Sequence, residues 1–388
     1  MQIKSITYQE LESAAAAEGL RVLRSTGLAP LEGAVKALID WQQAGYSGEM
    51  AYMQRPASHF GDLARLLPSA KSIVSFAVPY SAAQHPVCPP GYGKVARYAW
   101  GLDYHTELPQ RMQCLIKRIQ AKLGWFEAGV FSDAVSILER AVAARGGLGF
   151  VGKNTLLIRP GQGSFFLLGE IVWELDICDQ PETPAYAGCR SCTRCLNACP
   201  TNAFVDERVL DARKCIAYLS IEKRGMLSLW ERRALGNWIF GCDVCQEVCP
   251  FNHAVQKEGR EPDLVNLGAL KGAGKILNLS AVLRIRTQEV WRTSFAHTAL
   301  ERARRAGLLR NAACVAVNTG AVALIPDLVN AFKEDSAPAV RATSFWALSE
   351  FYNLGALSHS AWCSIVQAAK SDVSSEVQKE YALLEAIS

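Results

Sequence analysis

Clustered cysteines constrain this 388-residue chain more than any other feature of its sequence. Four of them form a closely spaced run that a proline follows: Cys189-x2-Cys192-x2-Cys195-x3-Cys199-Pro200. Three thiolates at this spacing can wrap one loop around three irons of a cubane cluster. The fourth lies past a turn and points elsewhere, so we expect it to bind a second cluster.

A second run supplies most of the remaining ligands. It is one cysteine short of the first: Cys242-x2-Cys245-x3-Cys249-Pro250. The isolated Cys215, between the two runs, is the simplest missing ligand. Because the last cysteine of such a run binds the other cluster, two [4Fe–4S] clusters account for all eight thiolates. One cluster is predicted to bind Cys189, Cys192, Cys195 and Cys249. The other is predicted to bind Cys199, Cys215, Cys242 and Cys245.

Zinc and disulfide bonds account for these cysteines less well. Structural zinc prefers two cysteine pairs separated by a loop, which does not fit the first run. Disulfides are disfavoured in a reducing compartment. Outside the cluster pattern, Cys314 and Cys363 lie in apolar, helical segments, and we expect buried, inert thiols at both.

A two-cluster module carries single electrons. By itself it would be a ferredoxin-like electron carrier, but here long stretches of chain flank it on both sides. This arrangement suggests that the electrons are delivered to something bound by the N-terminal part.

Composition is that of an ordinary folded protein, with 50% hydrophobic and 20% charged residues, and the length favours two or three domains. No run of 18 apolar residues occurs, so we expect no membrane-spanning helix and no membrane partner. The N-terminus lacks the apolar core of a secretory signal, so the expected location is the cytoplasm. Nothing suggests a coiled coil, and a monomer is the default expectation.

The chain divides into three segments of different character. Residues 1–175 show the mixed strand and helix patterns of an α/β domain. Residues 176–255 are rich in cysteines and turns and short of long apolar runs, so we expect metals to hold that fold together. Residues 275–388 are helical, and the residues from Arg310 align with those from Arg341 at an offset of 31. This offset resembles a HEAT-type repeat, although it is shorter than the roughly 40–47 residues usual for that class.

Within the first segment, residues 73–78 predict a buried strand, and 31–43 and 110–123 predict helices. Residues 155–158 and 165–175 predict two strands that pair with each other across a turn-rich connection.

Asp133 follows a strand expected to end at Phe131 and precedes a helical stretch, so it can be a helix N-cap or a catalytic acid. The glycine-rich residues 146–153 allow either close approach to a cofactor or a tight connection. Asp103-Tyr104-His105 begins like the Asp-x-His-x-x-Gly motif of proteins that ligate cobalamin through histidine. Leu108 replaces the glycine, so no such site is predicted, and His105 is expected to be a packed or surface histidine.

Seven arginines lie between Arg284 and Arg310, against only Glu289 and Glu301. This basic block can contact phosphates, or it can be a solvated helix face. We favour phosphate binding, with Arg302, Arg305 and a helix-opening Arg310 along one ridge.

Several motifs in a fixed order resemble epoxyqueuosine reductase. Besides the two cysteine runs, they are Phe131-Ser-Asp133, Glu139-Arg-Ala-x-Ala-Ala-Arg145, Gly149-Phe-Val-Gly-Lys-Asn-Thr155, Tyr218-Leu-Ser-Ile-Glu222, Gly241-Cys-Asp-Val-Cys245 and Gly307-Leu-Leu-Arg-Asn-Ala312. Each motif alone is moderately specific, whereas the ordered set is highly specific and covers nearly the whole chain.

The resemblance implies a fold of three domains. They are an α/β N-terminal cobalamin-binding catalytic domain (1–175), a small bacterial-ferredoxin-like two-cluster domain (176–255) and an all-α HEAT-like tRNA-binding domain (275–388). It also implies an oxidoreductase that reduces epoxyqueuosine to queuosine at the wobble position of tRNA. Electrons would come from an external donor, of the flavodoxin or ferredoxin type or a reductase, and pass through the two clusters to cobalamin.

The resemblance assigns roles to particular residues. Asp133 corresponds to the proton donor, for which a raised pKa beside the corrin is expected. The residues expected to border cobalamin are Arg55, Asp133, Lys153, Asn154 and Asp243. The residues expected to face tRNA are Lys223, Arg224, Arg302, Arg305 and Arg310. The alternatives are a reductive dehalogenase-like cobalamin and iron–sulfur oxidoreductase, which usually carries an export signal, and a ferredoxin-like electron carrier without a corrin.

Overall fold

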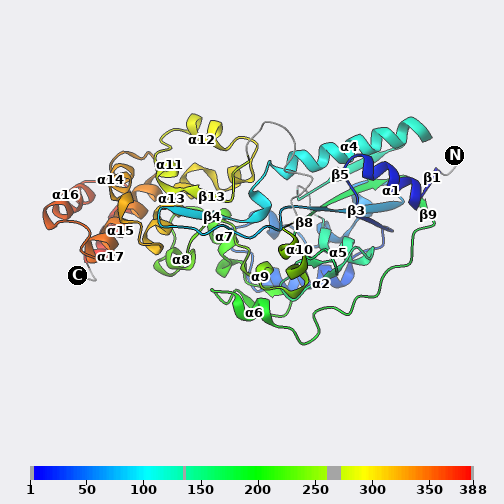
Figure 1. Ribbon diagram of the computed structural model, residues 1–388, viewed down its shortest axis with the longest axis horizontal. Helices are drawn as coiled ribbons and strands as arrows, with labels where there is room; N and C mark the ends of the chain where they lie inside the picture. The colour runs from blue at the N-terminus through cyan, green and yellow to red at the C-terminus, as the bar shows by residue number, and fades with distance from the viewer. Residues whose placement is uncertain (1–3, 134–136, 260–271, 386–388) are drawn as a thin grey trace. The chain divides into compact units, whose positions relative to one another are not determined.

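The computed structural model describes residues 4–133, 137–259 and 272–385, which form two compact units (Figure 1). The first unit contains the described residues of 1–84, 101–212 and 243–270. The second contains those of 85–100, 213–242 and 271–388. The expected boundary near 175 does not coincide with a boundary between these units, whereas the boundary between 270 and 271 lies in the expected interval from 255 to 275. The three consecutive domains stay a prediction.

A four-stranded antiparallel sheet is the centre of the first unit, with the strand order β2-β3-β8-β5. The strands are β2 (Leu23–Thr26), β3 (Ser72–Pro79), β8 (Phe166–Trp173) and β5 (Ala128–Phe131). β3 is buried along almost its whole length, because it lies between two other strands and helices cover both faces. The prediction of a buried strand at 73–78 is confirmed.

Helices pack on both faces of this sheet (Figure 1). α4 (Tyr104–Leu123) covers one face, where its Leu108 and Met112 fill the space beside Gly169 of β8. α5 (Glu139–Arg145) covers the other face, where Val142 packs with Ile73 and Val172. Residues 75 and 170 therefore point toward the side of α5, because alternate residues of a strand share a face.

The helix predicted at 31–43 is confirmed as α2 (Glu32–Gln43). The helix predicted at 110–123 is confirmed as α4, which begins six residues earlier because the Asp103 side chain caps it by accepting from the His105 N–H.

The predicted pairing of residues 155–158 with 165–175 is wrong. β7 (Leu157–Ile158) pairs with β6 (Phe150–Val151), whereas β8 pairs with β3 and β5. An isolated bridge between Arg159 and Gly163 lies in the connection between these two segments. An apolar run of eight residues can be buried between two partner strands, so it does not have to pair with the strand that precedes it in the sequence.

The remaining elements of the first unit are short. They include β1 (Ser5–Thr7), which pairs in parallel with β9 (Asp176–Cys178), and the hairpin of β10 (Phe204–Asp206) and β11 (Val209–Leu210). The helices are α1 (Tyr8–Ala17), α3 (Ser58–Gly61), α6 (Arg194–Ala198), α9 (Val244–Glu247) and α10 (His253–Glu258). Short 3-10 turns are η1 (Ala51–Gln54), η2 (Ala64–Leu66) and η5 (Pro250–Asn252), and η4 (Ala212–Lys214) spans a unit boundary.

The second unit combines a small sheet with many helices. Its sheet has the order β12-β4-β13, formed by β12 (Trp238–Phe240), β4 (Tyr92–Val95) and β13 (Ile276–Asn278). The first helices are α7 (Ile216–Ile221), α8 (Leu229–Ala234), α11 (Leu279–Leu283) and α12 (Gln288–Phe295). The later helices are α13 (Arg304–Asn318), α14 (Ile325–Glu334), α15 (Pro338–Asn353), α16 (His359–Lys370) and α17 (Ser375–Glu385). Its 3-10 turns are η3 (Arg97–Ala99), η6 (Ala299–Ala303) and η7 (Val322–Leu324).

Ion pairs that are buried or partly buried repeat along the later helices. Arg305 of α13 binds both carboxylate oxygens of Asp335, and Arg341 of α15 binds both oxygens of Asp372. Each aspartate also accepts a backbone N–H two residues further on, at 2.8 Å. The chain thus uses the same link at a spacing of 30 and then 31 residues, close to the offset seen in the sequence.

Of the two cysteines expected to be buried, only one is buried in the structure. Cys314 is fully buried in α13, as expected, but Cys363 of α16 is exposed, so that prediction is wrong. α16 packs on neighbouring helices through its Ile365 face, which leaves Cys363 on the outer face. No helix within the described ranges is both long and apolar enough to cross a membrane.

Candidate active site

Asp133 lies just beyond the end of β5, in a left-handed backbone conformation with φ of 51°. The backbone N–H of Asp133 donates to Oε1 of Glu139 at 2.6 Å, and the preceding Ser132 hydroxyl donates to the Leu168 carbonyl at 3.0 Å. The N-cap position of α5 belongs to Leu138, so the interpretation of Asp133 as a helix cap is wrong. The Asp133 carboxylate is 63% exposed and does not cap the helix.

The first turn of α4 supplies the partners of the Asp133 carboxylate. The Tyr104 hydroxyl donates to Oδ2 at 2.7 Å, and Nε2 of His105 lies 3.6 Å from the same oxygen. The other ring nitrogen of His105 lies 2.7 Å from Oδ1 of Asp103. The Tyr104 and His105 rings stack at 4.1 Å, so the three side chains form one connected group around the carboxylate.

This group makes His105 a cation and Asp133 an anion at neutral pH. Hydrogen bonding to Asp103 and then to Asp133 raises the pKa of His105 to about 9. Partial burial raises the pKa of Asp133, but the hydrogen bonds from His105 and Tyr104 outweigh it, and the pKa falls below its usual value. The side chains alone lower the pKa of Asp133, and the raised pKa expected beside the corrin stays a prediction.

Two glutamates lie behind Asp133. Burial, followed by the negative charge of Asp133, raises the pKa of Glu139 to about 7. Glu170, on β8, is completely buried, and burial together with the charge of Glu139 raises its pKa well above the usual value. A carboxyl group in such a place is held uncharged, because an isolated buried charge costs far more than a shifted pKa.

Arg140 connects Asp133 to the cysteine region. Arg140 follows Glu139, and its Nη1 donates to the Thr155 carbonyl. Two residues just before Thr155 contact the cysteine region. The Lys153 N–H contacts Sγ of Cys189 at 3.5 Å, and Nδ2 of Asn154 donates to the Cys245 carbonyl at 3.4 Å. Residues 152–155 thus lie between the candidate acid and the cysteines.

The four cysteines of the first predicted cluster all belong to the first unit, although no three of the described metal-ligating side chains are arranged to hold a metal ion. α6 and α9, which carry Cys195 and Cys245, pack together, and Cys249 follows α9. Burial raises the pKa of the Cys195 thiol, and the nearby Cys189 and Cys249 add to that effect. Burial likewise raises the pKa of Cys249, which Cys189 and Cys192 adjoin. The ligands predicted for the second cluster are divided between the units, with Cys199 and Cys245 in the first and Cys215 and Cys242 in the second.

The residues predicted to border cobalamin all belong to the first unit. Asp133 and Arg55 are exposed, whereas Lys153, Asn154 and Asp243 are buried. Nζ of Lys153 forms an ion pair with Glu207 at 2.5 Å, so this ammonium group is already paired. Arg55 ends the η1 segment, whose Met53 packs in one cluster with Leu138, next to Glu139.

Two of the five residues predicted to face tRNA do not do so. The Arg305 side chain is only 7% exposed and pairs with a fully buried Asp335. Arg310 is in the middle of α13 rather than at its start, is 1% exposed, and donates to the carbonyls of Leu219, Lys223 and Gly225. The Arg310 guanidinium donates to backbone carbonyls that lack a helix partner, and the Arg305 guanidinium binds a buried carboxylate. Both groups are buried, so no phosphate reaches them.

The other three predicted tRNA contacts lie at the surface of the second unit. Nζ of Lys223 pairs with Glu231 at 2.9 Å, and Arg302, 51% exposed, binds both oxygens of Glu222. Arg224 donates to the carbonyl groups of Ile221 and Arg302.

Comparison with known proteins identifies the family. Residues 61–134 match a family model described as "Epoxyqueuosine reductase QueG, DUF1730", and residues 188–252 match a "4Fe-4S double cluster binding domain". An epoxyqueuosine reductase of Synechocystis is 36% identical over 295 residues, which are 74% of this chain and 98% of that protein. The chain belongs to the epoxyqueuosine reductase family.

Solved structures of epoxyqueuosine reductases have the same fold. One, in complex with an epoxyqueuosine-modified tRNA-Tyr stem loop, is 28% identical with a TM-score of 0.83, and the match covers 96% of both chains. Another, from Bacillus subtilis, is 26% identical with a TM-score of 0.84 and the same coverage. Its catalytic loop, named for an aspartate, is described as swung out of the active site.

The family resemblance assigned a catalytic role to Asp133 but not to the residues that surround it. Tyr104, His105, Glu139 and Glu170 come from three separate elements, and their grouping depends on the sheet. One signal was available in the sequence: Glu170 is the only charged residue in the apolar run Phe165–Trp173. A charged residue inside a buried strand is rarely structural unless it is paired.

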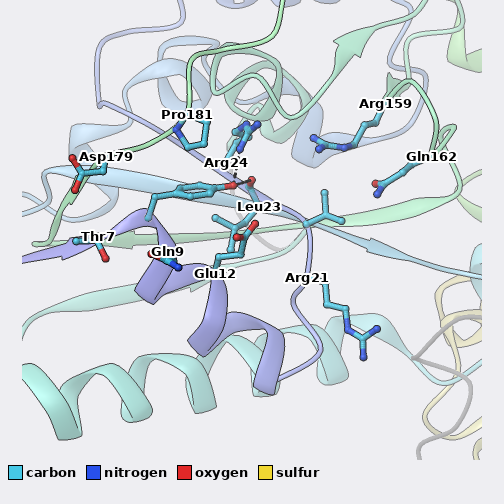
Figure 2. Close-up of a pocket in the computed structure, with 12 residues that line it drawn as sticks. Thr7, Gln9, Glu12, Arg21, Leu23, Arg24, Arg159, Gln162, Asp179 and Pro181 are labelled. Carbon is cyan, nitrogen blue, oxygen red and sulfur yellow. Dashed lines mark hydrogen bonds between the residues drawn. The ribbon is translucent and has the colours of Figure 1, made fainter.

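The epoxyqueuosine reductase fold also contains a separate pocket of about 640 Å³ beside the edge strand β2 (Figure 2). Its lining includes Arg24, whose Nη1 donates to the Tyr8 hydroxyl at 2.6 Å, and Arg159, which donates to the Leu148 carbonyl. None of the residues predicted for catalysis, cofactor binding or tRNA binding lines this pocket.

Proposed function

We propose that this protein reduces epoxyqueuosine to queuosine at the wobble position of tRNA. Membership in the family supports the reaction, and the 4Fe–4S double cluster domain supports the supply of electrons. The observation that carries the proposal is the exposed Asp133 carboxylate, held by Tyr104 and His105 in the same unit as the four cysteines predicted for the first cluster.

Removal of the epoxide oxygen requires both electrons and protons. Two C–O bonds break, a C=C bond forms, and the oxygen leaves as water after it has taken up two electrons and two protons. Asp133 is placed to pass a proton to the departing oxygen, because its carboxylate is exposed and its loop position is fixed from behind by Glu139. His105 and Tyr104 orient that carboxylate from the first turn of α4.

The described residues of the first unit would hold a cobalamin without using His105 as a ligand. His105 is bound to Asp103 and Asp133, and Leu108 is fully buried at the place where a ligating motif would have glycine. Arg55, Asp133, Lys153, Asn154 and Asp243 are the residues we assign to the border of the cofactor. When bound, cobalamin supplies low-potential electrons at the substrate, and the cluster cysteines supply the path to it.

We assign Lys223, Arg224 and Arg302 of the second unit to contacts with tRNA. We assign the later helices of that unit to a short HEAT-like array. The repeated Arg–Asp links, Arg305 with Asp335 and Arg341 with Asp372, support that array. Replacement of Lys223, Arg224 and Arg302 by alanine should weaken stem-loop binding and its salt dependence in a filter-binding titration. Unchanged binding would remove these residues from the tRNA interface.

We also assign to this protein an external donor of the flavodoxin or ferredoxin type, or a reductase, together with a cytoplasmic location and a monomeric state. Light scattering on the purified protein tests the last of these, because a dimer would show twice the mass of 42.3 kDa.

The deciding experiment uses anaerobic protein reconstituted with iron, sulfide and cobalamin. A strong reductant and an anticodon stem-loop that contains epoxyqueuosine are added, and the digested nucleosides are weighed by mass spectrometry. Loss of one oxygen atom, dependent on cobalamin, is the expected result. No mass change, with about eight irons still bound per chain, would leave the two clusters and contradict the substrate.

A further inference from the structure

The pocket beside the edge strand β2 is lined by none of the residues assigned to the proposed reaction or to tRNA (Figure 2). Its lining residues come from four short segments of the first unit: 7–12, 21–24, 159–162 and 179–181. A cavity of about 640 Å³ has the size of a site for a small organic molecule. The charged groups of the lining indicate which kind of molecule this pocket can bind.

Arg24 brings to this pocket a positive charge that is not paired with a carboxylate of any described residue. Its Nη1 donates to the Tyr8 hydroxyl at 2.6 Å, and the guanidinium lies 5.5 Å from the centre of the Tyr8 ring. Its Nε is buried and has no hydrogen-bond partner among the described residues. Because water screens a partly buried charge poorly, an uncompensated guanidinium in such a place attracts an anion strongly.

Arg159 brings a second such charge to the pocket. Its Nη1 donates to the Leu148 carbonyl at 2.9 Å, and it too forms no ion pair with a carboxylate among the described residues. Burial raises the pKa of Tyr8, and the charges of Arg24 and then Arg159 oppose that effect, so both charges lie near the Tyr8 hydroxyl. In Figure 2 the Arg159 side chain points toward Arg24, whereas that of Arg21 points away. Two guanidinium groups therefore converge on one part of the pocket.

Two carboxylates limit the kind of anion that fits. Glu12 of α1 and Asp179, which follows β9, line the same pocket, are exposed and form no ion pair with a described residue. Burial and then the charge of Glu12 raise the pKa of Tyr8, so this carboxylate also lies near the Tyr8 hydroxyl. A nucleic-acid backbone would bring further phosphates against these carboxylates, whereas a molecule with one anionic group would not. The charges thus favour a small anion over a polyanion.

We propose that this pocket binds a small organic molecule through one oxyanion group, a phosphate monoester or a carboxylate, held by Arg24 and Arg159. Guanidinium groups bind both kinds of oxyanion through paired, charge-assisted hydrogen bonds. The side chains of Gln9 and Gln162, which also line the pocket, offer amide donors and acceptors to hydroxyl groups of the same molecule. Because none of the groups assigned to the reduction lines the pocket, its occupancy does not depend on the proposed reaction.

Isothermal titration calorimetry of the reconstituted protein tests the proposal with two probes of similar size. Ribose 5-phosphate carries the phosphate monoester and glucuronate carries the carboxylate, while ribose and glucose are the uncharged controls. One or both charged probes should bind with a Kd of roughly micromolar to millimolar, and the probe that binds more tightly identifies the preferred group. No binding of either charged probe at about 10 mM would overturn the proposal, and so would equal binding of the uncharged sugars.

Variants determine whether the probe binds in this pocket. Arg24→Gln and Arg159→Gln should each weaken binding of the preferred probe roughly tenfold or more, because each removes a charge-assisted hydrogen bond. Glu12→Gln should tighten binding roughly threefold, because a like charge beside the oxyanion is lost. Arg65→Gln is the matched control and should bind as the wild type does, because Arg65 is exposed, donates to the His59 carbonyl and lies outside the pocket.

Unchanged binding in either pocket arginine variant, or an equal loss in Arg65→Gln, would overturn the proposal. Circular dichroism and iron content establish that each variant is folded. Glu12 is exposed and has no hydrogen bond to a described residue, so Glu12→Gln stays informative even if loss of a pocket arginine impairs folding. Unchanged or weaker binding in Glu12→Gln would place the oxyanion elsewhere and contradict the assignment.

Competition with RNA distinguishes a small-molecule site from a part of the tRNA interface. An excess of unmodified anticodon stem-loop should leave binding of the preferred probe unchanged, because the carboxylates of Glu12 and Asp179 repel a polyanion. Displacement of the probe by the stem-loop would assign the pocket to the RNA interface and overturn the proposal. None of these measurements requires reduction of epoxyqueuosine, so they remain valid even if the proposed function fails.

Discussion

Asp133 combines an exposed carboxylate with a backbone that is held firmly in place. Its left-handed conformation is uncommon for a residue other than glycine, and the Glu139 contact and the β5 strand maintain it. The carboxylate itself faces Tyr104 and His105, which come from the capped start of α4. At the scale of residues, the site is therefore an ion pair placed at a sheet edge rather than a buried neutral acid.

Replacement of Asp133 by asparagine should remove most turnover. The amide keeps the size and the hydrogen bond to Tyr104 but cannot supply a proton, so we expect a loss of roughly 100-fold or more in the single-turnover rate. The rate is measured with the reconstituted protein and the modified stem-loop, and cobalamin binding, followed by its absorbance, should be retained. Full activity in Asp133→Asn would exclude the acid role.

His105 should make the protein more stable at acidic than at alkaline pH, relative to His105→Gln. Its pKa is about 9 in the folded protein and about 6.5 in the unfolded chain, so the folded state binds the proton more tightly. The extra stability is fully present below pH 6.5 and is lost as pH rises to 9. Thermal melts of both proteins from pH 6 to 9.5 should converge at the alkaline end. A constant difference in Tm would contradict the ion pair.

At the scale of elements, short-range chemistry of the chain explains where helices begin, and packing explains which arginines are buried. Asp103 caps α4, and the aspartates after α14 and α16 accept N–H groups that precede the next helices. The same aspartates bind Arg305 and Arg341, so each link joins a turn to a helix 30 or 31 residues away.

Loss of the Arg305 guanidinium should destabilise the second unit strongly. In Arg305→Ala the fully buried Asp335 keeps its charge without a cationic partner, which costs roughly 3–5 kcal/mol. Arg302→Ala is the matched control, because Arg302 is 51% exposed and its pair with Glu222 is worth no more than about 1 kcal/mol. Urea unfolding followed by far-ultraviolet circular dichroism measures both. Equal effects of the two variants would show that burial of the pair is not decisive.

At the scale of the whole molecule, the metal content depends on residues far apart in sequence. Cys249 lies 54 residues after Cys195, yet the two thiols adjoin each other in the first unit. The first predicted cluster therefore depends on a ligand from each cysteine run, as the crossing rule requires.

Replacement of Cys249 by serine should remove one cluster from the protein. Iron analysis of the reconstituted variant should fall from about eight to about four atoms per chain, because the three cysteines of the first run lose their fourth ligand. Cys363→Ser, at an exposed cysteine outside both runs, is the control and should retain all the iron. Retention of about eight irons in Cys249→Ser would refute the assignment of ligands.

The sequence by itself determined the features that depend on local spacing. The cysteine runs indicate iron–sulfur clusters, the apolar run at 73–78 predicts β3, and the residues after Phe131 place Asp133 at the end of a strand. Strand and helix periodicity and ligand spacing act over a few residues, so they can be read from the chain alone.

Only the tertiary structure decided which side chains meet. Arg305 and Arg310 looked like a phosphate-binding ridge, but helix packing buries both against Asp335 and backbone carbonyls. Glu139 and Glu170 gave no sign of lying near each other, yet α5 lies on the face of β8 that carries Glu170. Such contacts join residues about 30 to 90 positions apart, and their ionisation follows from burial and neighbouring charges that exist only after the sheet and helices have packed.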